Sequence, residues 1–127
     1  MYFVTFQYEG KEKVGVLSEN KTFVIPIENV IKENTPSTMI ELIEKYSDED
    51  FESVKLEGFK DSGINIADVK ILSPIPQPLR NIICVGKNYE DHIKEVAKVI
   101  DDTDTIPKYP IYFSKLFDRM LGPEDHI

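Results

Sequence analysis

The sequence predicts an α+β protein, with a small antiparallel β meander and covering helices followed by a separate strand–helix–strand unit. Three observations support this fold class. Short runs rich in β-branched and aromatic residues alternate with turn signals over residues 2–27. Apolar residues recur at helical spacing over residues 38–56. Prolines at positions 74, 76 and 78 then form an extended linker, because proline fits neither a helix interior nor a central strand.

The meander is predicted from three strands near the N-terminus. Residues 2–8 and 13–17 are typical of a β-hairpin, joined by the turn Glu9-Gly10-Lys11. Residues 22–27 form a third strand with Pro26 near its end. A sheet this small needs other elements packed on its open face to be stable.

Two helical segments are predicted to supply that cover. Thr38, followed three residues later by Glu41, indicates a capping box at the start of the first helix. An apolar stripe follows, and a core-facing helix is preferred over a binding groove as its interpretation. The stripe comprises Met39, Ile40, Leu42, Ile43 and Tyr46. A second, acidic helix begins near Ser47, and its carboxylates are interpreted as a solvated helix N-terminus rather than a metal site.

The proline linker sets the predicted domain boundary. It separates an N-terminal α+β domain, residues 1–73, from a second part, residues 74–127. The N-terminal domain ends in a strand at residues 69–72, and residues 1–72 are expected to form the ordered core.

The second part opens on the apolar run Ile82-Ile83-Cys84-Val85, which predicts a buried strand. Gly86 ends the strand, a helix follows to about residue 97, and residues 109–113 form the next strand. Connections of this kind hold binding and catalytic side chains on a rigid scaffold.

Composition excludes several classes of partner. The net charge of −8 argues against nucleic acid and anionic membranes, since both require clustered Lys and Arg. No secretory signal is evident at the N-terminus, and no run approaches the ~20 apolar residues that span a bilayer. Cys84, the single cysteine, is interpreted as a small core residue rather than a nucleophile. A cytoplasmic location is therefore expected.

His92 and Glu95 are the candidate catalytic pair. Three residues apart on a helix, they share a face and lie ~4.5 Å apart along its axis. The carboxylate can hydrogen-bond the imidazole, fix its tautomer and raise its basicity, giving a general base for water or a carbon acid. An ordinary ion pair on a solvated helix surface is the alternative.

The residues around this pair favour the catalytic interpretation. The segment Gly86-Lys87-Asn88-Tyr89-Glu90-Asp91-His92-Ile93-Lys94-Glu95 resembles the G-x-N-Y-x-x-H-x-x-E signature of the fumarylacetoacetate hydrolase superfamily. Further landmarks of that family follow the expected order: Leu72-Ser73-Pro74-Ile75-Pro76, Phe113-Ser114-Lys115 and Gly122-Pro123-Glu124-Asp125-His126-Ile127. The resemblance covers about residues 69–127, and the preceding residues are similar to the small N-terminal domain of bacterial members.

The resemblance implies a mixed β-roll catalytic domain that uses Mg²⁺ or Mn²⁺ and assembles as a homo-oligomer. It implies hydrolysis, decarboxylation or isomerisation of acylpyruvates, β-diketo acids or related 2-oxo acids. By the family pattern, His92 is the general base and Glu95 its orienting partner. Asn88 and Tyr89 shape the substrate pocket, and Lys115 faces the substrate carboxylate.

The family's metal ligands, an E-x-E pair downstream of the Gly122-Pro123 turn and a later Asp, have no counterpart among the 127 residues. No metal-ligating residue is therefore predicted, and the chain is expected to be an N-terminal fragment that binds no cation and is inactive alone. Residues 81–97 are expected to pack on the core or to pair with another copy of the chain. A non-catalytic interaction or oligomerisation module, and a complete small enzyme without metal, are the alternatives.

Overall fold

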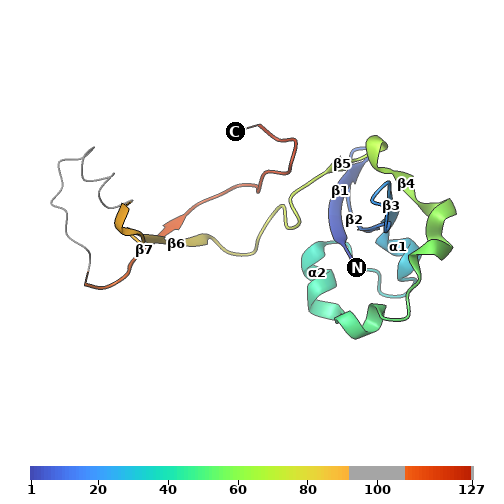
Figure 1. Ribbon diagram of the computed structural model, residues 1–127, viewed down its shortest axis with the longest axis horizontal. Coiled ribbons are helices and arrows are strands. Elements are labelled where there is room, and N and C mark those ends of the chain that lie inside the picture. Colours follow the sequence, from blue (N-terminus) through green and yellow to red (C-terminus); the bar gives the residue numbers. More distant parts are fainter. Residues whose placement is uncertain (92–107, 127) are drawn as a thin grey trace. The chain divides into compact units, whose positions relative to one another are not determined.

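The computed structural model of the protein describes residues 1–91 and 108–126 (Figure 1). The chain forms two compact units: an N-terminal unit, Met1–Pro78 with Arg119–Ile127, and a hairpin unit, Leu79–Asp118. The first stretch of the N-terminal unit ends at Pro78, whereas the predicted boundary follows residue 73. The last residues of the chain, from Arg119, also belong to the N-terminal unit. Compactness does not by itself test the division into domains 1–73 and 74–127, which stays a prediction.

An antiparallel five-stranded sheet, in the order β4-β3-β2-β1-β5, organises the N-terminal unit (Figure 1). Its strands are β1 (Phe3–Tyr8), β2 (Lys11–Leu17), β3 (Phe23–Pro26), β4 (Ile64–Asn65) and β5 (Lys70–Ile71). The first three are the predicted meander. The two-residue strands β5 and β4 form the two edges of the sheet. Strand β5 pairs with β1 through Phe6↔Ile71, and β4 pairs with β3 through Val24↔Ile64.

The hairpin register follows from the backbone of its turn. Tyr8 pairs with Lys11, so Glu9 and Gly10 form a two-residue loop, and both have positive φ, 50° and 75°. Loops with two positive φ angles match the right-handed twist of the flanking strands.

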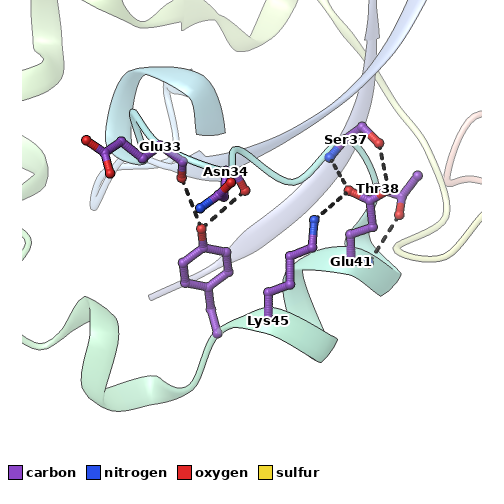
Figure 2. Close-up of polar contacts among 7 residues, drawn as sticks. Glu33, Asn34, Ser37, Thr38, Glu41 and Lys45 are labelled. Carbon is purple, nitrogen blue, oxygen red and sulfur yellow. Dashed lines mark hydrogen bonds and ion pairs between the residues drawn. The ribbon is translucent and has the colours of Figure 1, made fainter.

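Helix α2 (Met39–Lys45) begins at Thr38, whose Oγ1 accepts a hydrogen bond from the Glu41 amide at 3.2 Å. Of the two reciprocal hydrogen bonds of the predicted capping box, only this one forms. Figure 2 shows that the Glu41 carboxylate turns to Ser37, where it accepts bonds from the backbone amide and the hydroxyl, each at 3.0 Å. These bonds, with Lys45 at 3.5 Å, lower the pKa of Glu41.

Shorter helical turns complete the cover of the sheet: α1 (Ile27–Val30) and the 3-10 helices η1 (Asp48–Phe51), η2 (Leu56–Ser62) and η3 (Ile66–Asp68). The core cluster joins strand β2 to helices α1, α2 and η1 through Val14, Val16, Ile27, Met39, Leu42 and Phe51. Every buried apolar side chain of the described residues lies between Phe6 and Leu72, as predicted for the ordered core. The α2 stripe is only partly core-facing, because Ile43 is 62% exposed.

The C-terminal residues dock on the N-terminal unit. Arg119 forms an ion pair with Glu12, and the Met120 amide donates to the Pro76 carbonyl at 2.8 Å. The Asp125 carboxylate accepts from Lys70 Nζ at 2.5 Å and from the Gly122 amide at 2.8 Å. A Gly122–Pro123 turn was predicted, but its attachment to β5 through Lys70 was not.

The hydrogen bond from Lys70 and, to a lesser extent, the one from the Gly122 amide hold the pKa of Asp125 below its ordinary value. A carboxylate of this kind stabilises the fold at pH above its unfolded pKa of ~3.9, and the effect is lost as pH falls through the lower folded pKa. We therefore expect Asp125→Asn to lower the urea midpoint slightly at pH 7 and to have almost no effect near pH 2. The exposed Asp68→Asn serves as control; an equal change in both variants would contradict the prediction.

The hairpin unit contains β6 (Ile82–Gly86) and β7 (Ile111–Lys115), paired antiparallel from Ile82↔Lys115 to Gly86↔Ile111. The strand at 82–86 was predicted, but its burial was not confirmed: Ile83 is 75% exposed and Val85 45%. Two paired strands have no second layer of their own to cover either face. Among the described residues, no helix has both the length and the apolar character that crossing a membrane requires.

Candidate active site

The candidate site begins where β6 ends. Gly86 is the last residue of the strand, and a Cβ there would meet the Phe113 ring of β7 at 3.5 Å, an ordinary contact distance. Lys87 follows with φ of 49°, in the left-handed region that a non-glycine residue rarely adopts. Glu9, Lys21 and Asn34 have the same conformation elsewhere in the described residues, so it identifies a tight turn here and not by itself a functional site. The reversal directs the chain from the strand into a helix, whose first residues are 90 and 91.

Asn88 and Tyr89 lie in this turn, between the strand and the helix. Both are exposed, and 72% of Tyr89 is accessible. The turn thus presents the two predicted substrate-binding side chains to solvent rather than packing them under the hairpin. An exposed amide and a phenol are suitable groups for contacting a small polar ligand.

Lys115 lies at the other end of the hairpin. It pairs with Ile82, whereas the turn with Asn88 and Tyr89 follows Gly86, four residues further along β6. Four residues of extended strand span ~13 Å. The hairpin by itself therefore does not bring Lys115 beside Asn88 and Tyr89, and its proposed contact with a substrate carboxylate stays a prediction.

The candidate base His92 and its partner Glu95 lie outside the described residues. Their shared helix face and their hydrogen bond therefore stay predictions. The described part of the site contributes the strand end, the left-handed Lys87 and the first helical residues that precede them.

Cys84 is half-buried and pairs with Phe113 across the two strands. Side chains of paired residues lie on the same face of a sheet, so the thiol is beside the Phe113 ring. Cys84 is nevertheless only half-buried and is not among the buried core residues of the described structure, so its interpretation as a small core residue is not confirmed.

A divalent cation has no fitting ligand set in the described structure. Residues 1–91 and 108–126 contain no group of three or more His, Cys, Asp or Glu side chains placed to hold a metal ion. The Mg²⁺ or Mn²⁺ that the resemblance implies is therefore not assigned to residues of this chain, and no catalytic step is derived through it.

No local sequence pattern predicted the Lys70–Asp125 pair, which attaches the Gly122–Pro123 turn to the sheet. Its two residues are 55 positions apart, too far for any local pattern.

Known proteins with similar sequences share one family. No family model matches the chain. It is 45% identical to oxaloacetate tautomerase YisK of Bacillus subtilis over 61 residues, which are 48% of this chain and 19% of the relative. It is 32% identical to the mitochondrial oxaloacetate tautomerase FAHD2A of Bos taurus over 116 residues, 90% of this chain and 34% of the relative.

A fumarylacetoacetate hydrolase domain-containing protein 2 homolog of Dictyostelium discoideum is 33% identical over 94% of this chain and 36% of its own length. Among solved structures, the fumarylacetoacetate hydrolase (EaFAH) of psychrophilic Exiguobacterium antarcticum matches 89% of this chain and 34% of its own, with 26% identity and a TM-score of 0.50. The matches thus span about a third of the relatives' length or less.

These relatives are named as oxaloacetate tautomerases and as fumarylacetoacetate hydrolase proteins. The chain belongs to the fumarylacetoacetate hydrolase superfamily, and its α+β fold agrees with that membership.

Proposed function

We propose that this chain supplies the general-base part of the active site of an enzyme that isomerises or hydrolyses a 2-oxo or β-diketo acid. The observation that carries the proposal is the placement of the motif. The turn Gly86-Lys87-Asn88-Tyr89 follows a strand and leads into a helix, in a chain 45% identical over 61 residues to an oxaloacetate tautomerase. Oxaloacetate, an acylpyruvate or a related acid is the proposed substrate class.

His92 is proposed to move the proton. In a tautomerisation, the imidazole takes a proton from the carbon beside the 2-oxo group, and the electron pair moves to the carbonyl oxygen, which is then protonated. In a hydrolysis, the same imidazole deprotonates the attacking water. Glu95 is a positioning residue that accepts a hydrogen bond from the second ring nitrogen and stabilises the imidazolium.

Asn88 and Tyr89 are proposed to contact the substrate from the turn, where their exposed positions leave them accessible. Lys115 is proposed to hold a substrate carboxylate. Its exposed, positively charged side chain supports that role. Because Lys115 pairs with Ile82, ~13 Å along the strand from the turn, it would contact a part of the substrate that does not touch the turn.

Enzymes of this superfamily generally use a divalent metal ion. The active enzyme is accordingly proposed to depend on Mg²⁺ or Mn²⁺, held by residues other than those described. Without such an ion, the enolate that forms on proton removal has no strong electrophile to stabilise it. The 127-residue chain is therefore proposed to be inactive by itself.

The test is an assay of the purified chain with oxaloacetate and an acylpyruvate, with and without Mg²⁺ or Mn²⁺. We expect the rates of enol–keto conversion and of C–C cleavage to stay at the uncatalysed level in every condition. Turnover that disappears in His92→Ala would overturn the proposed inactivity and support a small enzyme complete in itself. Turnover that survives in His92→Ala would overturn the assignment of the base.

Location and assembly complete the proposal. The chain is proposed to work in the cytoplasm as a homo-oligomer, on the basis of its single half-buried cysteine and of its family. Cell fractionation and light scattering of the purified protein test the two statements.

A further inference from the structure

The outer edge of the N-terminal sheet is covered by the C-terminal residues 119–126, which we call the strap. Strand β5 is the last strand of that sheet and pairs with β1 on one side only. The Leu72 amide donates to the Thr5 carbonyl of β1, so the carbonyl of Ile71, one residue earlier, faces away from β1. The strap passes this outer side in the antiparallel direction and meets its partners in descending order: Met120 with Pro76, Gly122 with Ile71, and Asp125 with Lys70. It therefore occupies the place of a further strand beside β5.

The closest approach of the strap to the sheet is at Gly122. A Cβ there would lie 2.9 Å from the Ile71 carbonyl oxygen and 3.0 Å from the Leu72 Cα. Both atoms belong to backbone that is paired with β1, whereas the strap is in no strand or helix. A side chain at this position would therefore displace the strap and leave the sheet in place.

Polar contacts at the surface hold the strap, and no core side chain does. None of residues 119–126 is buried, and none belongs to the core cluster. Two ion pairs, Arg119–Glu12 and Asp125–Lys70, join the strap to the sheet through side chains that are 20% to 45% exposed. Within the described part of the chain, one backbone hydrogen bond joins the strap to the rest of its unit, from the Met120 amide to the Pro76 carbonyl at 2.8 Å.

Contacts of this kind separate the stability of the strap from that of the core. Exposed ion pairs contribute little free energy each, and dissolved salt screens them. Segments with few buried apolar contacts open locally, at a lower free energy than global unfolding requires. Opening the strap breaks two ion pairs and one backbone bond, and it leaves the packing of the core cluster unchanged.

We propose that the strap is a latch that opens and closes on the outer edge of β5 while the rest of the N-terminal unit stays folded, and that salt favours the open state. In the closed state the strap covers the β5 edge. In the open state that edge is accessible to solvent, and the strap is attached to the unit only through the preceding chain.

The latch also acts on the strand that precedes it. Arg119, the first residue of the strap, follows Lys115 of β7 by four positions. With the strap closed, the chain is held to β2 through Arg119 and Glu12; with the strap open, this restraint behind Lys115 is absent. This consequence for a substrate contact rests on the proposed role of Lys115, whereas the latch itself does not.

The test is amide hydrogen exchange of the whole chain, followed by NMR at low and at high NaCl concentration. The Met120 amide reports the closed strap, because its acceptor is the Pro76 carbonyl. We expect this amide to be protected, but at least about tenfold less than the amides shared by β1 and β2. Raising NaCl from about 0.05 to about 0.5 M should lower its protection at least about threefold and change that of β1 and β2 by less than about twofold.

Two variants with matched controls separate the latch from general stability. Gly122→Ala should lower the protection of the Met120 amide about tenfold or more and leave β1 and β2 unchanged. Its control is Gly58→Ala, where a Cβ meets nothing within 4 Å. Lys70→Gln should lower the same protection and reduce its dependence on salt, whereas Lys45→Gln, which breaks the exposed ion pair with Glu41 on α2, should do neither.

Several outcomes would overturn the proposal. If the Met120 amide exchanged as slowly as those of β1 and β2, the strap would open only when the whole unit unfolds. If it had no protection at low salt, the strap would not be closed. Protection that is independent of salt, equal effects of Lys70→Gln and Lys45→Gln, or loss of the circular dichroism of the unit in Gly122→Ala would each contradict a separate, charge-dependent latch.

Discussion

Gly15→Val is expected to unfold the N-terminal unit or to destabilise it by about 3 kcal/mol or more. A Cβ at Gly15 would lie 2.8 Å from the Ile25 carbonyl oxygen of β3 and 2.9 Å from the Phe6 ring of β1. Both neighbours are nearly inaccessible, and Ile25 belongs to a paired strand, so neither can move without separating the sheet. Urea denaturation followed by circular dichroism measures the loss.

Gly58→Ala is the matched control. A Cβ at Gly58 meets nothing within 4 Å, so this substitution should change the free energy of unfolding by no more than about 0.5 kcal/mol. If Gly15→Val were as well tolerated as this control, the close approach of β1 and β3 to Gly15 would be wrong, and with it the packing of the central strand.

In an active enzyme that contains this chain, His92→Gln is expected to lower kcat about 10²- to 10⁴-fold with oxaloacetate or an acylpyruvate as substrate. Glutamine keeps the polarity and approximate size of the side chain but cannot accept and release a proton near neutral pH. KM should change little, because the imidazole acts in proton transfer more than in ground-state binding. Steady-state kinetics across pH 5 to 9 are the measurement.

Glu95→Gln separates a positioning role from a structural one. Loss of the carboxylate should lower the apparent pKa of the base and shift the acidic limb of the kcat/KM profile to lower pH, with a smaller loss of rate than His92→Gln. A structural role would change the stability of the protein and leave the acidic limb of the kcat/KM profile in place.

If His92→Gln retained full kcat, the general base would have to be another residue.

Local sequence patterns predicted much of the N-terminal unit. The hairpin was evident because Gly10 is a turn residue, and the strands on either side are rich in β-branched and aromatic residues. The start of α2 was evident because Thr38 and Glu41 stand three apart. The reciprocal hydrogen bond of the capping box did not form, because the Glu41 carboxylate accepts its bonds from Ser37, the residue before Thr38, instead.

Short strands and distant partners escaped prediction. Strands β4 and β5 have two residues each, too few to show a period. The run 82–85 predicted a buried strand because its residues are apolar, but composition does not show what covers a strand, and the hairpin unit leaves Ile83 exposed. For the candidate site, the sequence named Asn88, Tyr89 and Lys115, whereas the register of β6 and β7 showed that Lys115 is at the opposite end of the hairpin.

The fold class and the family could be predicted from the sequence alone, because periodicity, turn residues and an ordered set of motifs are properties of neighbouring residues. The contact between Asp125 and Lys70, and the hollow that Phe3, Ile43 and Phe51 line together, became evident only from the folded chain. These residues are far apart along the chain. Their contacts depend on how strands and helices pack, and packing places each surface by the shape and volume of all the side chains beneath it.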